Sequence, residues 1–165
     1  MIVSSPVRTF PDGRSNAQVE RRVYLYPGGL WAEGAPAVVT TVLGSCVSVV
    51  LWDPYTSLGG INHYILPSSG SVVSARYGNH ALPMLHERVL LLGARRETLL
   101  ACVFGGASVL SGEGSASKLG ERNLAEAFRF LESRNIAVLR QDAGGREGRK
   151  VTFRTADGST LVRKL

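Results

Sequence analysis

Short apolar runs, each closed by turn residues, dominate the first half of the chain. Their length and their β-branched composition predict strands rather than helices. Glycine and proline mark where the runs stop, as at Pro27-Gly28-Gly29 and at Pro67. The strands predicted in this half are Val19–Tyr26, Ala37–Leu43, Val47–Trp52 and Gly60–Leu66.

Two later segments have the apolar spacing of amphipathic helices. Asn79–Leu92 is the first, and Gly93 follows it as a suitable helix end. Gly120–Arg134 is the second, and Asn135 can adopt the left-handed conformation that often ends a helix. The apolar faces consist of Leu82, Leu85, Val89 and Leu92 in the first helix, and of Leu124, Ala127, Phe128 and Leu131 in the second.

Strand patterns return around and after these helices. The additional strands are Leu99–Phe104, Ile136–Leu139, Lys150–Thr155 and Ser159–Leu165. Asp157-Gly158 between the last two is a strong hairpin signal. The small-residue segments Ser68–Ser74 and Ser111–Ser117 are predicted loops. Because strands and helices do not alternate regularly, the order favours an α+β fold over a doubly wound sheet.

The chain of 165 residues fits one domain, and no linker divides it. Residues 1–22 form a polar segment that we interpret as an irregular N-terminal arm, and residues 23–165 are the predicted domain. An apolar fraction of 44% and a mean hydropathy of +0.06 are typical of a globular protein. No apolar run approaches the roughly 18 residues that span a bilayer, and the N-terminus lacks a secretory pattern. We therefore expect a cytoplasmic protein without membrane insertion.

The net charge of +6 is concentrated near the C-terminus. Lys118–Leu165 contains 11 basic and 6 acidic residues, which gives +5. This charge favours an acidic partner or is simply a solvated basic face. Zinc-finger spacing, RNP-like aromatic motifs and lysine-rich tails are absent from the sequence, so nucleic-acid binding is not predicted.

Cys46 is the strongest candidate for chemistry because it follows Gly44-Ser45 in a tight bend between two predicted strands. An exposed bend allows a thiol to reach a substrate, and Gly44, Ser45 and the Cys46 N–H are candidates for oxyanion binding and substrate approach. His63, in the next strand, is a candidate base, and Thr40 is a candidate hydrogen-bond partner for its imidazole. We expect the Cys46 thiolate to be populated near neutral pH.

The remaining cysteine and histidines have plainer interpretations. Cys102 lies in an apolar strand, where burial disfavours the thiolate. His80 and His86, at or in the first helix, are competing bases or surface residues. The three histidines lack ligand-like spacing with a carboxylate or thiol, so no metal site is predicted. Two cysteines do not form a disulfide framework.

Six ordered motifs together resemble the CheD family, from about Val23 to the C-terminus. The resemblance depends on their order and spacing, because the glycine motifs taken alone are more often tight turns. The motifs are Thr40–Val47, Gly59–Pro67, Arg76–Asn79, Phe104–Ala107, Gly120–Asn123 and Gly144–Val151.

The resemblance implies hydrolysis of glutamine side-chain amides on methyl-accepting chemotaxis receptors. It implies Cys46 as nucleophile, His63 as general base and Thr40 as third member of the triad, acting through a thioester without a metal or organic cofactor. The implied fold is similar to that of deamidating cytotoxic necrotizing factors, with two packed β-sheets and two main helices alongside. A CheC-type phosphatase is a further implied partner.

Two other functions remain open from the sequence. One is a non-catalytic signalling module that regulates a CheC-type phosphatase, and the other is transglutamination by the same thiol. Two positions depart from the family pattern: Cys102 stands where lysine is more usual, and Val109 where methionine is common. Neither lies in the expected triad.

Overall fold

The predicted strands pair into two sheets in the computed structural model, which describes residues 20–108 and 118–165. The four-stranded sheet has the order β1 (Arg21–Tyr24), β3 (Ala37–Leu43), β8 (Arg149–Arg154) and β9 (Thr160–Lys164). The five-stranded sheet has the order β2 (Leu30–Trp31), β5 (Leu58–Asn62), β4 (Val47–Asp53), β6 (Leu100–Gly105) and β7 (Ala137–Ala143). Both sheets are mixed, because β1–β3 and β6–β7 are parallel and the other pairs are antiparallel.

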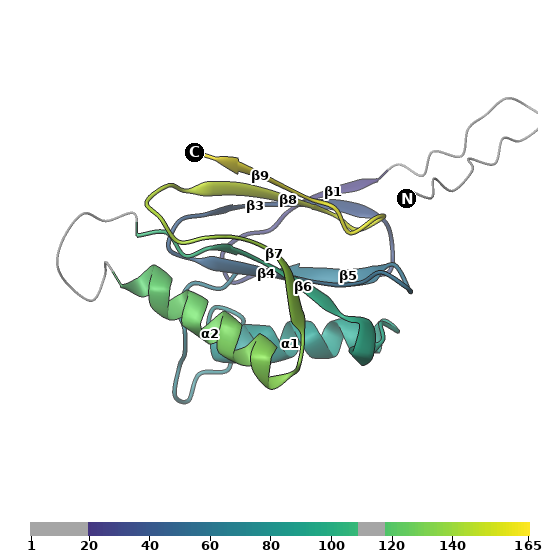
Figure 1. Cartoon of the computed structure of the whole chain (residues 1–165), viewed down its shortest axis with the longest axis horizontal. Helices are drawn as coiled ribbons and strands as arrows, with labels where there is room; N and C mark the ends of the chain where they lie inside the picture. The colour runs from purple at the N-terminus through teal and green to yellow at the C-terminus, as the bar shows by residue number, and fades with distance from the viewer. Residues whose placement is uncertain (1–19, 109–117) are drawn as a thin grey trace, which may run out of the picture.

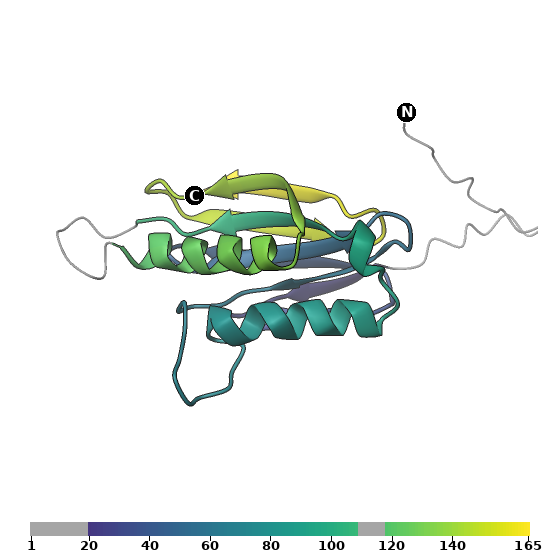
Figure 2. The same cartoon turned by 60° about the horizontal axis from the view of Figure 1, so that its bottom comes forward.

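The two sheets and the helices form three layers (Figure 1). The helices α1 (Gly78–Leu91) and α2 (Leu119–Ser133) lie side by side on the outer face of the five-stranded sheet, as Figure 2 also shows. One apolar cluster fills the space between the helices and this sheet, and a second lies between the two sheets. A short 3-10 helix, Arg96–Thr98, connects α1 with β6. In the part of the chain that the structure describes, no helix has the length and apolarity to cross a membrane.

Strand β3 separates its side chains cleanly between two environments. Val39, Thr41 and Leu43 are fully buried, and Val39 and Leu43 belong to the apolar cluster between the sheets. Thr40 and Val42 alternate with them and point to the outer face of the four-stranded sheet, since successive residues of a strand face opposite sides. This alternation decides which threonine can reach the space between the sheets.

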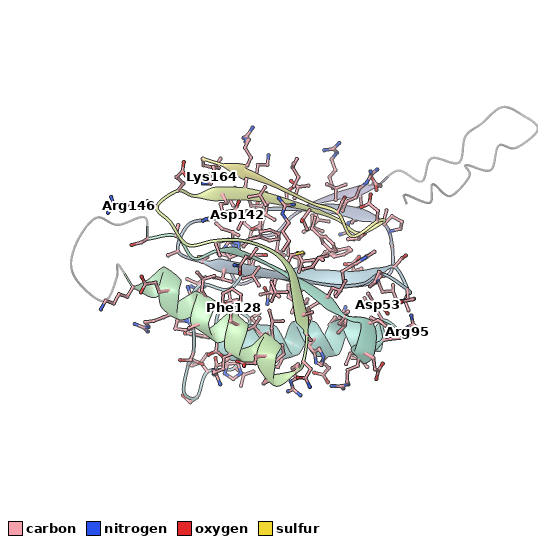
Figure 3. The ribbon with its side chains drawn as sticks, in the orientation of Figure 1. Asp53, Arg95, Phe128, Asp142, Arg146 and Lys164 are labelled. Carbon is pink, nitrogen blue, oxygen red and sulfur yellow. The ribbon has the colours of Figure 1, made fainter. Side chains whose placement is uncertain are left out.

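The two ends of the sandwich differ in chemistry. At one end β3 turns into β4 beside the β7–β8 turn, where Figure 3 labels Arg146. At the other end Figure 3 places Asp53 close to Arg95. The buried Asp53 carboxylate accepts hydrogen bonds from the backbone N–H groups of Tyr55 (3.0 Å) and Arg95 (2.8 Å). It also accepts hydrogen bonds from the hydroxyls of Thr56 (2.8 Å) and Thr98 (2.7 Å), so the carboxylate fixes this end.

The α+β class, the two sheets and the two main helices are confirmed. The strand β1 lies within the one predicted at Val19–Tyr26, so Arg21 and Arg22, which the predicted arm also included, pair with β3. The strand predicted at Gly60–Leu66 runs from Leu58 to Asn62 instead. Beyond it, Tyr64 still pairs with Val47 of β4, whereas the backbones of His63 and Ile65 bond to loop residues. Strand β2 was not predicted. The rest of the N-terminal arm, Val109 and the loop at Ser111–Ser117 lie outside the described residues.

Candidate active site

Cys46 ends the bend that joins β3 to β4, and contacts from the segment at the end of β6 fix this bend. The Gly44 carbonyl accepts a hydrogen bond from the Ala107 N–H (2.9 Å), and the Cys46 carbonyl accepts one from the Gly106 N–H (2.8 Å). A Cβ on Gly105 would lie 2.2 Å from the Cys46 carbonyl oxygen, so the close approach requires glycine there. Cys46 is half-buried against the apolar cluster between the sheets.

His63 follows directly after β5, and its backbone is fixed on both sides. Its N–H donates to the Gly29 carbonyl (2.9 Å), and its carbonyl accepts from the Gly28 N–H (2.7 Å). Gly28 adopts a φ of +81°, which glycine accommodates without strain. The Pro27-Gly28-Gly29 turn, predicted only as a strand end, therefore holds the histidine backbone.

The register between the two segments brings Cys46 and His63 to the same face of the sheet. Val47 and Tyr64 exchange two backbone hydrogen bonds, of 3.1 and 3.0 Å, as an antiparallel pair. Cys46 precedes one member of this pair and His63 precedes the other. The two residues are consequently diagonal neighbours, whose Cα atoms lie about 7–8 Å apart in antiparallel sheets. Both side chains point to the side of the sheet that faces β3.

The hydroxyl of Thr41 determines the tautomer of His63. Thr41 Oγ1 lies 2.7 Å from the Leu25 carbonyl oxygen and 2.7 Å from His63 Nδ1, and all three residues are buried. The carbonyl can only accept, so the single hydroxyl proton is donated to Leu25. Nδ1–H must then donate to Thr41 Oγ1, which leaves an unshared electron pair on Nε2. The imidazole is therefore oriented and ready to accept a proton.

The hydrogen bond expected from Thr40 to this imidazole is not present, because Thr41 makes it. Thr40 lies on the outer face, where its Oγ1 is 3.3 Å from Oγ1 of Thr152. It also lines a shallow hollow of about 320 Å³ on that face, together with Arg22, Tyr24 and Lys150 among others. The alternation of β3 is the physical reason for the correction, since adjacent threonines cannot face the same side.

Burial shifts both groups toward their neutral forms. It lowers the pKa of His63 to about 4, although the backbone contact with Leu25 opposes this shift. Burial also raises the pKa of the Cys46 thiol, although the backbone N–H of Cys46 has a smaller opposite effect. The expectation of a thiolate near neutral pH is thus wrong for the resting protein. At neutral pH the thiol of Cys46 and the imidazole of His63 are therefore both uncharged.

The other cysteine and histidines are not part of this arrangement. Cys102 is buried within β6, and burial raises the pKa of its thiol. His80 and His86 belong to α1, which covers the opposite face of the five-stranded sheet, and His86 packs edge-on against Phe130. Among residues 20–108 and 118–165, no three His, Cys, Asp or Glu side chains cluster in a way that could hold a metal ion.

Asn123 is a polar contact of the site to which the sequence analysis assigned no role. Its Nδ2 donates to the Ser45 carbonyl (2.9 Å) and to the Ile65 carbonyl (2.9 Å). The side chain is fully buried, although α2 lies on the outside of the five-stranded sheet. The sequence does indicate that Asn123 is buried, because it precedes Ala127 by one helical turn and thus lies on the predicted apolar face.

Comparison with known proteins gives a consistent result. The family model described as CheD chemotactic sensory transduction matches residues 65–164. A protein of Anaeromyxobacter dehalogenans, named probable chemoreceptor glutamine deamidase CheD 1, is 45% identical over 156 residues, which cover 94% of this chain and 89% of that protein. A protein of Trichlorobacter lovleyi, named probable chemoreceptor glutamine deamidase CheD, is 44% identical over 144 residues, covering 86% and 89%. The first alignment is long enough to include Cys46 and His63 wherever it begins, whereas the family-model match starts after both.

Proposed function

This chain belongs to the CheD family, and from that premise we propose that it hydrolyses glutamine side-chain amides of chemoreceptors to glutamate with Cys46 as nucleophile and His63 as base. Relatives that cover most of the chain are named as probable chemoreceptor glutamine deamidases. The observation that carries the chemical part is the Thr41 contact, because it leaves His63 Nε2 free to accept a proton on the face that Cys46 shares.

The proposed reaction begins from the neutral pair. Nε2 of His63 takes the thiol proton as Sγ of Cys46 attacks the amide carbon, which forms the S–C bond and moves the carbonyl electrons onto oxygen. The imidazolium then protonates the amide nitrogen, so ammonia leaves and a thioester remains. Water, deprotonated by the same imidazole, attacks the thioester carbon, the C–S bond breaks, and the imidazolium returns its proton to the departing thiolate. The new carboxyl group ionises and its proton is taken up by ammonia. The net reaction consumes one water and yields glutamate and ammonium.

Thr41, rather than Thr40, supports the base in this mechanism. Its Oγ1 accepts from Nδ1–H in the resting state and continues to accept when the ring becomes positively charged. No metal or organic cofactor is required by these steps. The Cys46 N–H, together with the Gly44-Ser45 backbone, is the proposed oxyanion-binding element.

Three finer expectations belong to the same proposal. We infer a fold of the deamidating cytotoxic necrotizing factor type, supported by two packed sheets with a cysteine at a strand junction. We expect the protein to act in the cytoplasm on the cytoplasmic part of receptors. Binding to a CheC-type phosphatase stays a prediction of the family resemblance.

The test is to incubate the purified protein with the cytoplasmic fragment of a methyl-accepting receptor and to map glutamine-to-glutamate conversion by mass spectrometry. Cys46→Ala should abolish conversion, while Cys102→Ala is the matched control and should retain it. No conversion of any receptor fragment by the wild type would refute the proposal and favour a non-catalytic signalling module. Incorporation of an added amine in place of water would instead identify a transglutaminase.

A further inference from the structure

All three carbonyl groups of the bend that carries the proposed nucleophile accept hydrogen bonds. The Gly44 and Cys46 carbonyls bond to backbone N–H groups of the segment after β6, at 2.9 and 2.8 Å. The Ser45 carbonyl is different, because its donor is the side chain of Asn123, at 2.9 Å. This contact joins residues 78 positions apart in the chain. It is the one of the three that a substitution can remove without changing the backbone.

The amide of Asn123 spans the two segments that carry the proposed chemistry. One N–H bonds to Ser45, the residue before the nucleophile, and the other bonds to the Ile65 carbonyl, two residues after His63. The helix that carries Asn123 is itself attached to the sheet, since the Tyr64 hydroxyl donates to the Asn123 backbone carbonyl at 2.6 Å. Asn123 is fully buried, so water does not compete for these two acceptors.

Peptide geometry transmits the contact to the nucleophile. In a planar trans peptide the C=O and the following N–H point in opposite directions. The Ser45 carbonyl is directed at Asn123, so the Cys46 N–H is directed away from it. In the described part of the chain this N–H has no hydrogen-bond partner.

We propose that Asn123 is a positioning residue that holds the Ser45–Cys46 peptide in the orientation that presents the Cys46 N–H to the oxyanion of the reacting amide. This role rests on the proposed function, because it concerns the same amide hydrolysis. In this role Asn123 acts through the peptide that it fixes.

The bonding of the amide itself supports a positioning role over simple stabilisation. Asn123 Oδ1 is buried and has no hydrogen-bond partner in the part of the chain that the structure describes. A buried carbonyl without a partner is unfavourable, so the asparagine is a poor choice for stability alone. Both of its donors are nevertheless used, and both reach the segments around Cys46 and His63.

The expected effect separates turnover from thiol reactivity. Loss of one oxyanion donor typically lowers kcat by about 10²–10³-fold. Asn123→Ala should therefore lower kcat on the receptor fragment by about 10²-fold and leave KM nearly unchanged. Alkylation of Cys46 by iodoacetamide is a displacement at saturated carbon that forms no oxyanion. Its rate should stay within about twofold of the wild-type rate, because the thiol and its base remain in place.

The experiment compares Asn123→Ala with Thr155→Val, a matched structural control. Thr155 Oγ1 accepts a buried hydrogen bond from the Ala37 N–H at 2.8 Å, and it lies at the end of β3 away from the bend. Both variants lose buried hydrogen bonding and should unfold at lower temperature, but only Asn123→Ala should lose kcat. Should Asn123→Ala fail to fold, Asn123→Asp preserves the side-chain shape and replaces the two donors by oxygen.

The outcomes distinguish this role from the deamidase proposal. Loss of kcat with intact alkylation supports the positioning role. Wild-type kcat in a folded Asn123 variant overturns it, and so does a parallel loss of turnover and alkylation, which would indicate general disorder of the site. Absence of wild-type deamidation under the same conditions refutes the deamidase function instead, and oxyanion positioning with it.

Discussion

Replacing Thr41 by valine tests the arrangement of the proposed base most directly. Valine has nearly the shape of threonine, so the substitution removes the hydroxyl from a fully buried position and leaves the packing of β3 in place. Two contacts disappear, namely the one to the Leu25 carbonyl and the one to His63 Nδ1, each 2.7 Å long. The imidazole then loses the group that fixes its tautomer.

The magnitude follows from the charge on the ring during the reaction. A hydrogen bond between neutral groups contributes about 0.5–1.5 kcal/mol, and one to a charged group about 1.5–3 kcal/mol. The bond to Thr41 should therefore strengthen by about 1–1.5 kcal/mol when His63 becomes imidazolium. Since 1.36 kcal/mol is a factor of ten in rate, this difference accounts for about a tenfold loss of kcat. Loss of the correct tautomer raises the expected loss toward about 10²-fold, the lower bound for a general base.

The assay is conversion of the receptor fragment followed by mass spectrometry, with the melting temperature measured in parallel. Thr41→Ser keeps the hydroxyl and should retain most activity. Thr40→Val is the matched control on the adjacent position and should retain nearly all of it, because Thr40 contacts Thr152 on the outer face. Loss of activity in Thr40→Val with full activity in Thr41→Val would refute the tautomer argument and reinstate the threonine that the family resemblance implies.

Four further predictions follow from burial and charge. Iodoacetamide should modify Cys46 before Cys102, because the Cys46 thiol is half-buried and the Cys102 thiol is buried. Activity should fall in proportion to the modification of Cys46, and early labelling of Cys102 alone would contradict this. The kcat/KM should fall only as pH drops toward about 4, where His63 becomes protonated, and an acid limb near pH 6.5 would show a different base. Raising salt from 0.01 to 0.15 M should lower kcat/KM on an acidic receptor segment if the +5 charge of Lys118–Leu165 steers association, since the Debye length shrinks from about 30 to about 8 Å. Burial tends to raise the pKa of Asp53, but its hydrogen bonds lower that pKa well below the usual range. The free energy of unfolding, measured with urea, should therefore decline as pH falls below about 4, and Asp53→Asn should remove part of this pH dependence.

The sequence was sufficient to predict most of the strands and the two helices because their apolar runs are bounded by turn residues. The sequence also predicted that Cys46 and His63 lie on neighbouring strands, since consecutive strands with a short connection usually pair. The expectation that Thr40 bonds to His63 is wrong for a specific reason. The run Ala37–Leu43 is apolar at positions of both faces, so its pattern shows no alternation from which the inward threonine could be identified.

Contacts across long stretches of chain were beyond the reach of the pattern. The short strand β2 has only two residues and becomes a strand through its pairing with β5. Asn123 is in a helix whose position over the bend depends on the complete sheet order. The polar interruption of its apolar face was visible in the sequence, but the acceptors, Ser45 and Ile65, could be identified only from the folded chain.

Burial of the site offers a physical reason why the proposed nucleophile would be selective without being generally reactive. The thiol of Cys46 and the imidazole of His63 are each shifted toward their neutral forms, so little thiolate exists before a substrate is bound. In the proposed mechanism the anionic nucleophile forms as proton transfer and attack occur together, and the developing charge then needs an oriented donor such as the Cys46 N–H. A small alkylating electrophile forms no oxyanion and would not use that donor, whereas a positioned glutamine amide would. Selectivity of the proposed deamidase therefore depends less on thiol acidity than on the hydrogen bonds that orient the groups around it, from Thr41 to the ring and from Asn123 to the bend.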